Sequence, residues 1–325
     1  MNKTYYFVTG GCGFIGSYVI QELLKNEDIE IVNIDKMGPG SSRSNVSDDK
    51  RVTNFYMDIN DPAVLTLFKN YKPTYIIHLA AESHVDRSIV NPIGFIESNV
   101  NGTANILEGM RLHVPKARMV HVSTDEVYGH LKLNEAPFTE LTPLDPRSPY
   151  SASKASSDLL ALSYRSTYNL DITVTRCCNN YGPRQDNEKL IPTVIRSIVT
   201  GKHIPMYGNG KNIREWIYVE DHAKAIIYVL HRLSQQRIYN LYGTEEIDNL
   251  KIMQIIIGEI ESKYPEYKRE DGDYIKSVED RLGHDFRYAM ATVHDDVLPL
   301  HNQCDFKDGI SKTVEYYVKK YATNK

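Results

Sequence analysis

The chain has no excess of basic residues, no long apolar segment and few cysteines. Its 325 residues carry a formal net charge of −4 at pH 7, which argues against the broad positive face that binds nucleic acid or an anionic membrane. No stretch approaches the ~20 apolar residues of a membrane span, and the first residues do not show the charged and apolar regions of a signal peptide. We therefore expect a soluble, cytoplasmic protein with no nucleic-acid or membrane partner.

The four cysteines, Cys12, Cys177, Cys178 and Cys304, do not form a disulfide or metal framework. Their spacing matches no C-x-x-C metal motif, and a chain of this length can bury a core without disulfides. Cys177 and Cys178 are adjacent at the end of an apolar run, where small buried residues are common. The sequence therefore predicts thiols in a reducing compartment, and no metal site.

Short apolar runs alternate with helical patterns through the first half of the chain. The runs that predict strands are 4–10, 29–35, 52–59, 73–81, 117–122 and 171–179, and the patterns that predict helices are 14–26, 63–71, 94–113 and 150–168. Because the strand runs are apolar without alternation, we expect helices to cover both faces of a parallel sheet. This order predicts an α/β protein with a Rossmann-type, doubly wound parallel sheet.

After about residue 180 the sequence is broken up by Pro, Gly and polar residues. Helical patterns persist at 191–201, 220–234, 249–263 and 308–322, with one short strand at 237–243. At 325 residues the chain can form one large domain or two ordinary ones. We predict a first domain over 1–178 and a smaller, loop-rich part over 179–325, some segments of which return to the first domain.

A glycine-rich turn near the N-terminus indicates a dinucleotide site. Gly11, Gly13 and Gly16 follow the first predicted strand and open the first predicted helix, with Gly10 in front of them. Such glycines allow a tight turn and let a pyrophosphate approach the backbone N–H groups at the positive end of the helix. The first domain is therefore predicted to bind a dinucleotide.

Polar residues at the ends of the next strands extend this site. Asp35 ends the second predicted strand, where a carboxylate accepts hydrogen bonds from the adenosine ribose and would repel the extra phosphate of NADP. Asp58 ends the third and is placed to accept a hydrogen bond from adenine, and residues 78–84 end the fourth beside the cofactor path. NAD is the predicted cofactor, although Lys36 and Arg43 lie close by in sequence and leave NADP open.

Two adjacent acids, Asp125 and Glu126, follow the fifth predicted strand directly after Thr124. Adjacent carboxylates repel each other and are costly to desolvate, and a solvated end of a strand would account for them without any function. Tyr150 and Lys154 lie four residues apart on one helix face, where an ammonium and a positive nicotinamide favour the phenolate. We therefore predict that Tyr150 removes a proton from a substrate hydroxyl, close to the acid pair.

These motifs resemble the extended short-chain dehydrogenase/reductase superfamily, and more closely its nucleotide-sugar 4,6-dehydratases, above all the dTDP-glucose 4,6-dehydratases. The resemblance covers nearly the whole chain. It rests on the blocks TGGCGFIGS, HLAAESHVDRSI, STDEVYG, PYSASKASSD, NNYGP, EKLIP, REWIYVEDH and RLGHDFRYA, in the order that the family has them. The Thr-Asp-Glu block is the most specific, because epimerases of the superfamily do not have the acid pair.

The resemblance implies a hydro-lyase that uses NAD to convert dTDP-glucose to dTDP-4-keto-6-deoxyglucose, in deoxysugar or rhamnose biosynthesis. Tyr150, with Lys154 and Thr124, would oxidise C4 of the hexose. Glu126 would remove the C5 proton and Asp125 would protonate the C6 hydroxyl so that water leaves, after which hydride returns to C6. An acid pair that shares one proton suits this division.

Three alternatives stay open at this point. UDP-glucose is the first, as the substrate of the same reaction. A UDP-sugar 4-epimerase or decarboxylase would need only Tyr150, Lys154 and Thr124, and would leave the acid pair without a role. An NAD-sensing binding protein on the same fold would be expected to have lost part of that triad, which is intact here.

The resemblance also implies which residues bind the two ligands. Cofactor-binding positions would be Gly10, Gly13, Phe14, Ile15, Gly16, Asp35, Lys36, Asp58, Ile59, Leu79, Ala80, Ala81, Ser83, Ser98, Tyr150 and Lys154. Substrate-binding positions would be Ser83, His84, Thr124, Asn179, Lys189, Leu190, Pro205, Tyr207, Arg214, Asn249, Arg281 and His284. Arg214 and Arg281 suit a diphosphate, because a guanidinium is a bidentate donor that stays charged.

The sequence departs from the pattern usual in the family at three places: residues 184–187, Leu282 and residues 290–300. All belong to the half that would hold the nucleotide, so the choice between dTDP and UDP stays open. The helices predicted at 94–113 and 150–168 are those that pair two subunits in this superfamily. The resemblance therefore implies a homodimer.

Overall fold

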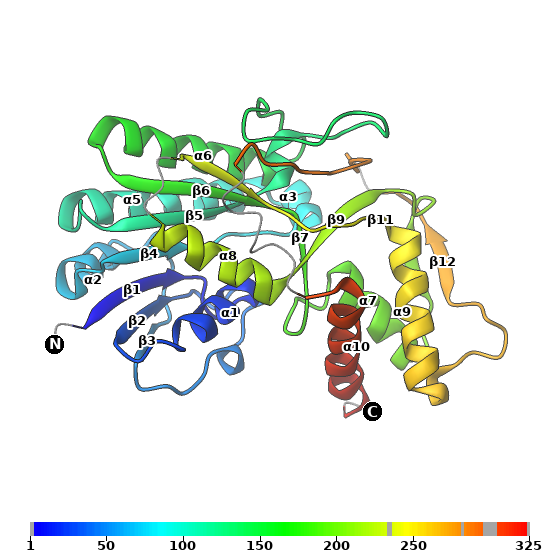
Figure 1. Ribbon diagram of the computed structural model, residues 1–325. Helices are drawn as coiled ribbons and strands as arrows, with labels where there is room; N and C mark the ends of the chain where they lie inside the picture. The colour runs from blue at the N-terminus through cyan, green and yellow to red at the C-terminus, as the bar shows by residue number, and fades with distance from the viewer. Residues whose placement is uncertain (1–2, 233–235, 281–282, 295–303, 324–325) are drawn as a thin grey trace.

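Seven parallel strands form the central sheet of the computed structural model, which describes residues 3–232, 236–280, 283–294 and 304–323 (Figure 1). From one edge to the other the strands are β3 (Val52–Phe55), β2 (Ile29–Ile34), β1 (Thr4–Thr9), β4 (Tyr75–His78), β5 (Arg118–Thr124), β6 (Asp171–Cys177) and β10 (Ile238–Leu241). The first six have the Rossmann order 3-2-1-4-5-6, so the predicted fold class is confirmed. The chain order reverses between β1 and β4, where ligands bind beyond the carboxyl ends of the strands.

Helices cover both faces of this sheet. One face carries α1 (Phe14–Leu23) and α8 (Val219–His231), which pack against each other. The other carries α2 (Ala63–Tyr71), α5 (Gly102–His113) and α6 (Pro149–Tyr168). A parallel sheet covered in this way is buried on both sides, which explains the continuous apolar runs.

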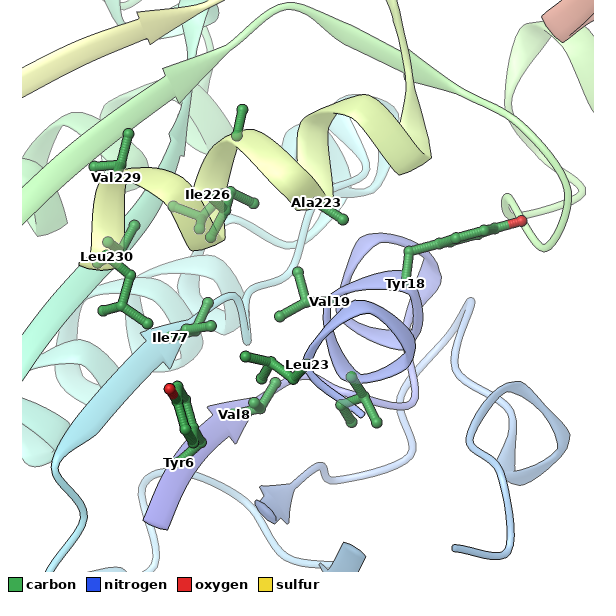
Figure 2. Packing of buried hydrophobic residues seen from close by; sticks show 14 of the residues in the cluster. Tyr6, Val8, Tyr18, Val19, Leu23, Ile77, Ala223, Ile226, Val229 and Leu230 are labelled. Carbon is green, nitrogen blue, oxygen red and sulfur yellow. The ribbon is translucent and has the colours of Figure 1, made fainter. Parts of the chain in front are cut away.

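Alternate strand residues enter two separate cores. Val8 of β1 belongs to the core beneath α1 and α8, whereas the neighbouring Phe7 belongs to the core beneath α2 and α5. Figure 2 shows Val19 and Leu23 of α1 lying between the strands and Ile226 of α8. Each such fully buried side chain stabilises the fold by about 1.5–3 kcal/mol. The two cores together fix the sheet between its helices.

The helical region before α5 is more broken than predicted. It consists of α3 (Val85–Val90), α4 (Pro92–Phe95) and a π-helical segment, η2 (Ile96–Asn101), that runs directly into α5. The sequence predicted a single helix over 94–113 and did not predict α3. Such π-helical segments are rare and often occur near functional sites.

A third apolar core joins most of the second half of the chain. It packs α7 (Leu190–Val199), α9 (Asn249–Lys263) and α10 (Phe306–Ala322) together. Two small sheets accompany them: β11 (Glu246–Asp248), β9 (Ile213–Tyr218) and β7 (Asn179–Tyr181) form one, and β12 (Ile275–Val278) and β8 (Ile204–Tyr207) the other. The two segments α8 and β10 instead pack with the central sheet.

Two predicted strands end earlier than expected. The third strand stops at Phe55 and not at residue 59, and the carboxylate of Asp58 accepts the N–H of Asn60 in a turn that follows the strand. Asp58 therefore lies three residues beyond the strand. The fourth stops at His78. The helix predicted over 220–234 corresponds to α8, and its last two predicted residues, 233 and 234, lie outside the described residues.

Candidate active site

The glycine turn between β1 and α1 has the geometry of a phosphate cradle. Gly10 has a φ of +76°, in the region that favours glycine. A Cβ on Gly16 would lie 2.2 Å from the carbonyl oxygen of Gly10, so the turn can close only around glycine. Gly13 is the N-cap of α1 and supplies no side-chain cap. The first N–H groups of α1 are thus available to a pyrophosphate, and these residues fit a dinucleotide.

The carboxylate of Asp35 is fixed at the end of β2. It is 4% exposed, and its two oxygens accept the N–H groups of Cys12 at 2.9 Å and Met37 at 2.8 Å. Each oxygen keeps a second lone pair for a ribose hydroxyl. The neighbouring Lys36 ammonium lies 2.9 Å from Glu82 and 3.7 Å from Asp58. Because two carboxylates already attract Lys36, it is a poor site for an additional phosphate, and these residues fit NAD better than NADP.

The loop after β4 is held from both sides. The hydroxyl oxygen of Thr9 accepts the N–H groups of Leu79 at 3.2 Å and Ala80 at 3.1 Å. Further along, the ammonium of Lys189 donates to the carbonyl oxygen of Ser83 at 3.1 Å. Residues of both halves of the chain therefore fix the loop that was predicted to line the cofactor and the sugar.

The acid pair lies at the carboxyl end of β5, where the short helix η3 (Asp125–Tyr128) begins. Thr124 caps this helix: its hydroxyl oxygen accepts the N–H of Glu126 at 3.3 Å, and its hydroxyl donates to Oδ1 of Asp125 at 3.1 Å. Asp125 is only 2% exposed, and its Oδ2 has no hydrogen-bond partner among the described residues. The solvated strand end is thus excluded for Asp125.

Burial gives Asp125 the properties of a proton donor. Desolvation, and then the negative charge of Glu126, raise the pKa of Asp125 from 3.8 to about 7, while the positive charge of Arg214 opposes them. Near neutral pH this side chain therefore carries a proton for much of the time. An acid that is protonated beside a second carboxyl can serve an elimination that needs a donor and an acceptor.

Tyr150 and Lys154 lie on the first two turns of α6. A capping box between Ser148 and Ser151 fixes the start of this helix. Tyr150 is buried; burial, and then the charge of Glu126, raise its pKa well above 10, and its contact with Thr124 works in the opposite direction. The ammonium of Lys154 donates to the carbonyl oxygen of Val122 at 2.8 Å. In the protein alone the tyrosine is therefore a neutral phenol.

Arg214 comes to the acid pair from β9. It is 5% exposed, and its guanidinium donates to the carbonyl oxygens of Ile213 at 2.7 Å and Asp285 at 2.9 Å. The guanidinium carbon lies 4.4 Å from the centre of the Tyr288 ring. Its positive charge lowers the pKa of Asp125. Arg214, which was predicted to bind the diphosphate, therefore lies close to Asp125, which was predicted to be the catalytic acid.

Two residues of this site were not predicted from the sequence. Tyr288 is 3% exposed and donates to Asp285, and burial followed by the charge of Glu126 raises its pKa well above 10. Glu215 is 6% exposed and accepts the N–H of Met290 at 2.9 Å. Burial is the main reason that the pKa of Glu215 rises to about 8, and the charge of Asp125 adds to it. Glu215 lies within the block REWIYVEDH and Tyr288 within the block RLGHDFRYA, so the resemblance was the signal that could have identified them.

The remaining predicted residues belong either to the cofactor set, in the first half of the chain, or to the nucleotide set, in the second half. The side chains of Phe14, Ile15 and Ile59 pack into the cores, which leaves their backbone for contact with a cofactor. Ser98 is buried within η2, which follows the loop after β4 by more than ten residues. The nucleotide positions are spread over four elements: Asn179 on β7, Lys189 and Leu190 at the start of α7, Pro205 and Tyr207 on β8, and Asn249 at the start of α9.

One end of the predicted nucleotide site is only partly described. The ring of His284 lies 6.4 Å from that of Tyr207, and its Nδ1 is 2.6 Å from Asp280. Arg281 and Leu282 lie outside the described residues. His84, predicted to line the sugar site, has its Nε2 at 3.2 Å from Glu188, which precedes Lys189 in the chain.

Other kinds of site are not found in the part of the chain that the structure describes. Within it, no three His, Cys, Asp or Glu side chains come together as a metal-binding group. No described helix has both the length and the apolar character needed to cross a membrane.

A Rossmann sheet with a glycine turn, an acid at the end of β2 and a threonine, tyrosine and lysine around one site defines an extended short-chain dehydrogenase/reductase. The sequence profile of the GDP-mannose 4,6 dehydratase family matches residues 7–313. With its acid pair, the chain belongs to the nucleotide-sugar 4,6-dehydratases of this superfamily.

Relatives and solved structures agree with this assignment. The dTDP-glucose 4,6-dehydratase 1 of Escherichia coli (strain K12) is 44% identical over 96% of this chain and 92% of its own. The dTDP-glucose 4,6-dehydratase of Neisseria gonorrhoeae is 42% identical over 97% and 96%. The dTDP-glucose 4,6-dehydratase of Streptomyces venezuelae, solved with NAD bound, is 38% identical, covers 98% of both chains and superposes with a TM-score of 0.89. A UDP-glucose 4-epimerase of Thermus thermophilus has a TM-score of 0.85 at 27% identity.

Proposed function

We propose that the protein is an NAD-dependent hydro-lyase that converts dTDP-glucose to dTDP-4-keto-6-deoxyglucose. One observation carries this choice over an epimerase: Asp125 is buried beside Glu126, and this burial raises its pKa to about 7. Loss of water from a hexose needs an acid at the leaving hydroxyl and a base at the neighbouring carbon. Inversion at C4 needs neither, so the acid pair would have no role in it.

The chain's own residues divide the work as follows. The glycine turn and Asp35 hold NAD, which supplies a hydride acceptor for C4 and a hydride donor for C6. Tyr150 takes the proton of the C4 hydroxyl, with Thr124 and Lys154 orienting it. Glu126 then removes the C5 proton, whose acidity the C4 ketone increases. Asp125 gives its proton to the C6 hydroxyl, so that water leaves. When C6 receives the hydride, a proton returns to C5, for which Glu126 is the donor.

The second half of the chain, 179–325, would hold the nucleotide. Arg214 suits the diphosphate because its guanidinium lies beside the acid pair and stays charged. Lys189, Tyr207 and His284 would complete this subsite together with Arg281. The relatives are named for dTDP-glucose, which favours that substrate over UDP-glucose.

We further infer a homodimer built from α6 and the helices that precede α5. The outward face of α6 carries the exposed residues Ala152, Ser156, Leu159 and Ser163, which are small or apolar where a solvated helix would be charged. Three large apolar residues on the neighbouring helical region, Val90, Ile93 and Ile96, are 85%, 59% and 46% exposed. A second copy of this chain is the partner that would cover them. The unpaired cysteines fit a cytoplasmic location.

Separate incubations with dTDP-glucose and UDP-glucose test the reaction. We expect mass spectrometry to detect the loss of one water from dTDP-glucose, with slower turnover of UDP-glucose. Release of stoichiometric NADP from the purified protein would contradict the cofactor. Interconversion of glucose and galactose nucleotides without loss of water would contradict the dehydratase and favour the epimerase.

A further inference from the structure

Behind the catalytic tyrosine lies a buried charged cluster, formed by Lys154, Asp158, Arg176 and His121. The four side chains come from α6, β6 and β5, and none is more than 5% exposed. Oδ2 of Asp158 accepts the Nε–H of Arg176 at 2.9 Å, and Oδ1 lies 3.4 Å from Nε2 of His121. The proposed mechanism uses Lys154 alone among these four residues.

The ammonium of Lys154 is costly to keep charged at this depth. Burial lowers the pKa of Lys154, and the negative charge of Asp158 is the main influence that raises it again. The two residues are four positions apart on one face of α6, where side chains are neighbours. The carbonyl oxygen of Val122 accepts a hydrogen bond from the ammonium but brings no charge. A buried ammonium without a counter-charge tends to lose its proton.

Asp158 is equipped to remain ionised. Burial alone would raise its pKa, but the nearby His121 ring, 3.4 Å from Oδ1, and the charge of Arg176 hold it below its ordinary value. The hydroxyl of Ser157 donates to the carbonyl oxygen of Lys154 at 2.8 Å, so Nε2 of His121, 3.0 Å from that hydroxyl oxygen, is the donor to it. Burial lowers the pKa of His121, which is therefore neutral.

The other groups that face the cluster are also neutral near pH 7. Burial raises the pKa of Cys177 on β6 to about 12 and lowers that of His78 on β4, whose ring lies 5.3 Å from that of His121. The ring of Tyr128 in η3 lies 4.7 Å beneath the guanidinium of Arg176, and its pKa is raised by burial. Among the described groups around the cluster, Asp158 is thus the ionised acid.

We propose that Asp158 is a positioning residue that keeps the Lys154 ammonium charged, and so keeps Tyr150 and the bound cofactor in the electrostatic environment that the reaction needs. This inference rests on the proposed function, in which Lys154 is the partner of Tyr150. Arg176 and His121 act through Asp158, since their contacts hold its carboxylate in place and in its charged form.

The test separates the charge of Asp158 from its shape. Asp158→Asn keeps the shape and removes the charge, and Asp158→Glu keeps the charge and changes the shape. In Asp158→Asn, Lys154 should lose its proton at lower pH than in wild type. We expect the ratio of kcat at pH 9 to kcat at pH 7 to fall by at least about tenfold, short of the ~10²–10⁴-fold loss of a full acid–base contribution. Asp158→Glu should leave this ratio unchanged, even where it lowers thermal stability.

Calorimetric titration with NAD gives a second reading that does not depend on turnover. The affinity of Asp158→Asn for NAD should decline with rising pH earlier than that of wild type. Asp171→Asn is the matched control. Asp171 forms a 2.7 Å pair with Arg118 at the amino ends of β5 and β6, the two strands that carry His121 and Arg176. It should leave both pH profiles unchanged. Should Asp158→Asn not fold, Asp158→Ser removes the same charge with a smaller side chain.

The outcomes distinguish this inference from the proposed function. If wild type does not dehydrate dTDP-glucose, the proposed function is wrong, and the NAD titration still decides the role of Asp158. A second outcome is an active wild type whose charge-free variants lose stability without any change in either pH profile. In that case Asp158 only forms a structural ion pair with Arg176, and the inference is wrong.

Discussion

At the scale of single residues, Asp125 acquires its chemistry from burial. Its folded pKa of about 7 lies above its ordinary 3.8. A carboxyl whose pKa is raised by folding stabilises the protein fully below its ordinary pKa, and that contribution is lost as the pH rises through the folded value. The ionised form of Asp125 therefore destabilises the protein in the neutral range.

Asp125→Asn should remove this pH dependence, because an amide does not titrate. In ligand-free protein, the free energy of unfolding of the variant relative to wild type should increase between pH 4 and pH 8. The gain should reach a few kcal/mol at most, since each pKa unit corresponds to about 1.4 kcal/mol. Urea unfolding at several pH values measures it, and parallel curves for the two proteins would show that Asp125 is not buried as described.

The acid pair should be needed for elimination and not for oxidation at C4. Asp125→Asn cannot donate a carboxylic proton, and Glu126→Gln cannot accept the C5 proton. Both variants should still reduce the bound cofactor when substrate is added, visible in near-ultraviolet absorbance, but should form product ~10²–10⁴-fold more slowly. Tyr150→Phe should block the absorbance change itself. Wild-type product formation by either acid variant would remove the basis for the assigned roles.

At the scale of secondary-structure elements, the turn between β1 and α1 tolerates no side chain at Gly16. Its Cβ would lie 2.2 Å from a backbone oxygen, so Gly16→Ala must displace the turn or the helix. We expect the affinity for NAD to fall by more than about tenfold, which is 1.4 kcal/mol. Calorimetric titration with NAD measures this loss.

Gly258→Ala in α9 is the matched control for this substitution. A Cβ there meets no atom within 4 Å, and alanine is favoured over glycine inside a helix by roughly 0.5–1 kcal/mol. This variant should therefore bind NAD as wild type does and unfold at a slightly higher temperature. Equal affinities in the two alanine variants would mean that the turn at Gly16 adapts without cost.

The elements that could be predicted from the sequence are those with continuous apolar runs. β1, β2 and β5 lie within one or two residues of their predicted bounds, because burial on both faces leaves a pattern that does not depend on distant contacts. β9 was missed, since its buried polar residues Arg214 and Glu215 interrupt that pattern. Their partners, the carbonyl oxygen of Asp285 and the N–H of Met290, are about 70 residues away in sequence and become neighbours only in the folded chain.

The difference between local patterns and distant contacts also separates the predicted part of the site from the rest. Thr124, Asp125 and Glu126 are consecutive, and Tyr150 and Lys154 share one helix face, so local sequence was enough to group them. Tyr288 reaches the acid pair only because residues 287–291 pair with segments near 131 and 138. No periodicity in the sequence predicts such a crossing.

At the scale of the whole molecule, the segment that departs from the family pattern joins the two halves of the chain. Arg184 donates to Ser17 at 3.4 Å and lies 4.7 Å over the ring of Tyr18, both on α1. Asn187 accepts a hydrogen bond from Tyr321 on α10 at 2.6 Å. Residues 184–187, which differ from the family pattern, therefore contact a helix of each half of the chain.

The other feature at this scale is the division of α6 into two faces. The inner face carries Tyr150, Lys154 and Asp158, and the outer face carries Ala152, Ser156, Leu159 and Ser163. A partner packed on the outer face would hold the same helix that positions the catalytic tyrosine. The proposed dimer would therefore stabilise the active site through α6.

Leu159→Arg tests this arrangement, with Leu141→Arg as its control. Leu159 is 59% exposed on α6, whereas Leu141 is 79% exposed on the segment between η3 and α6, outside the helices assigned to the interface. An arginine buried between two copies without a partner charge should raise the dimer dissociation constant at least about tenfold, as measured by light scattering across a dilution series. Leu141→Arg should remain a dimer. Because a monomer loses support for α6, Leu159→Arg should also unfold at a lower temperature than Leu141→Arg. A wild-type monomer at micromolar concentration, or equal dissociation constants for the two variants, would place the subunit contact elsewhere or exclude it.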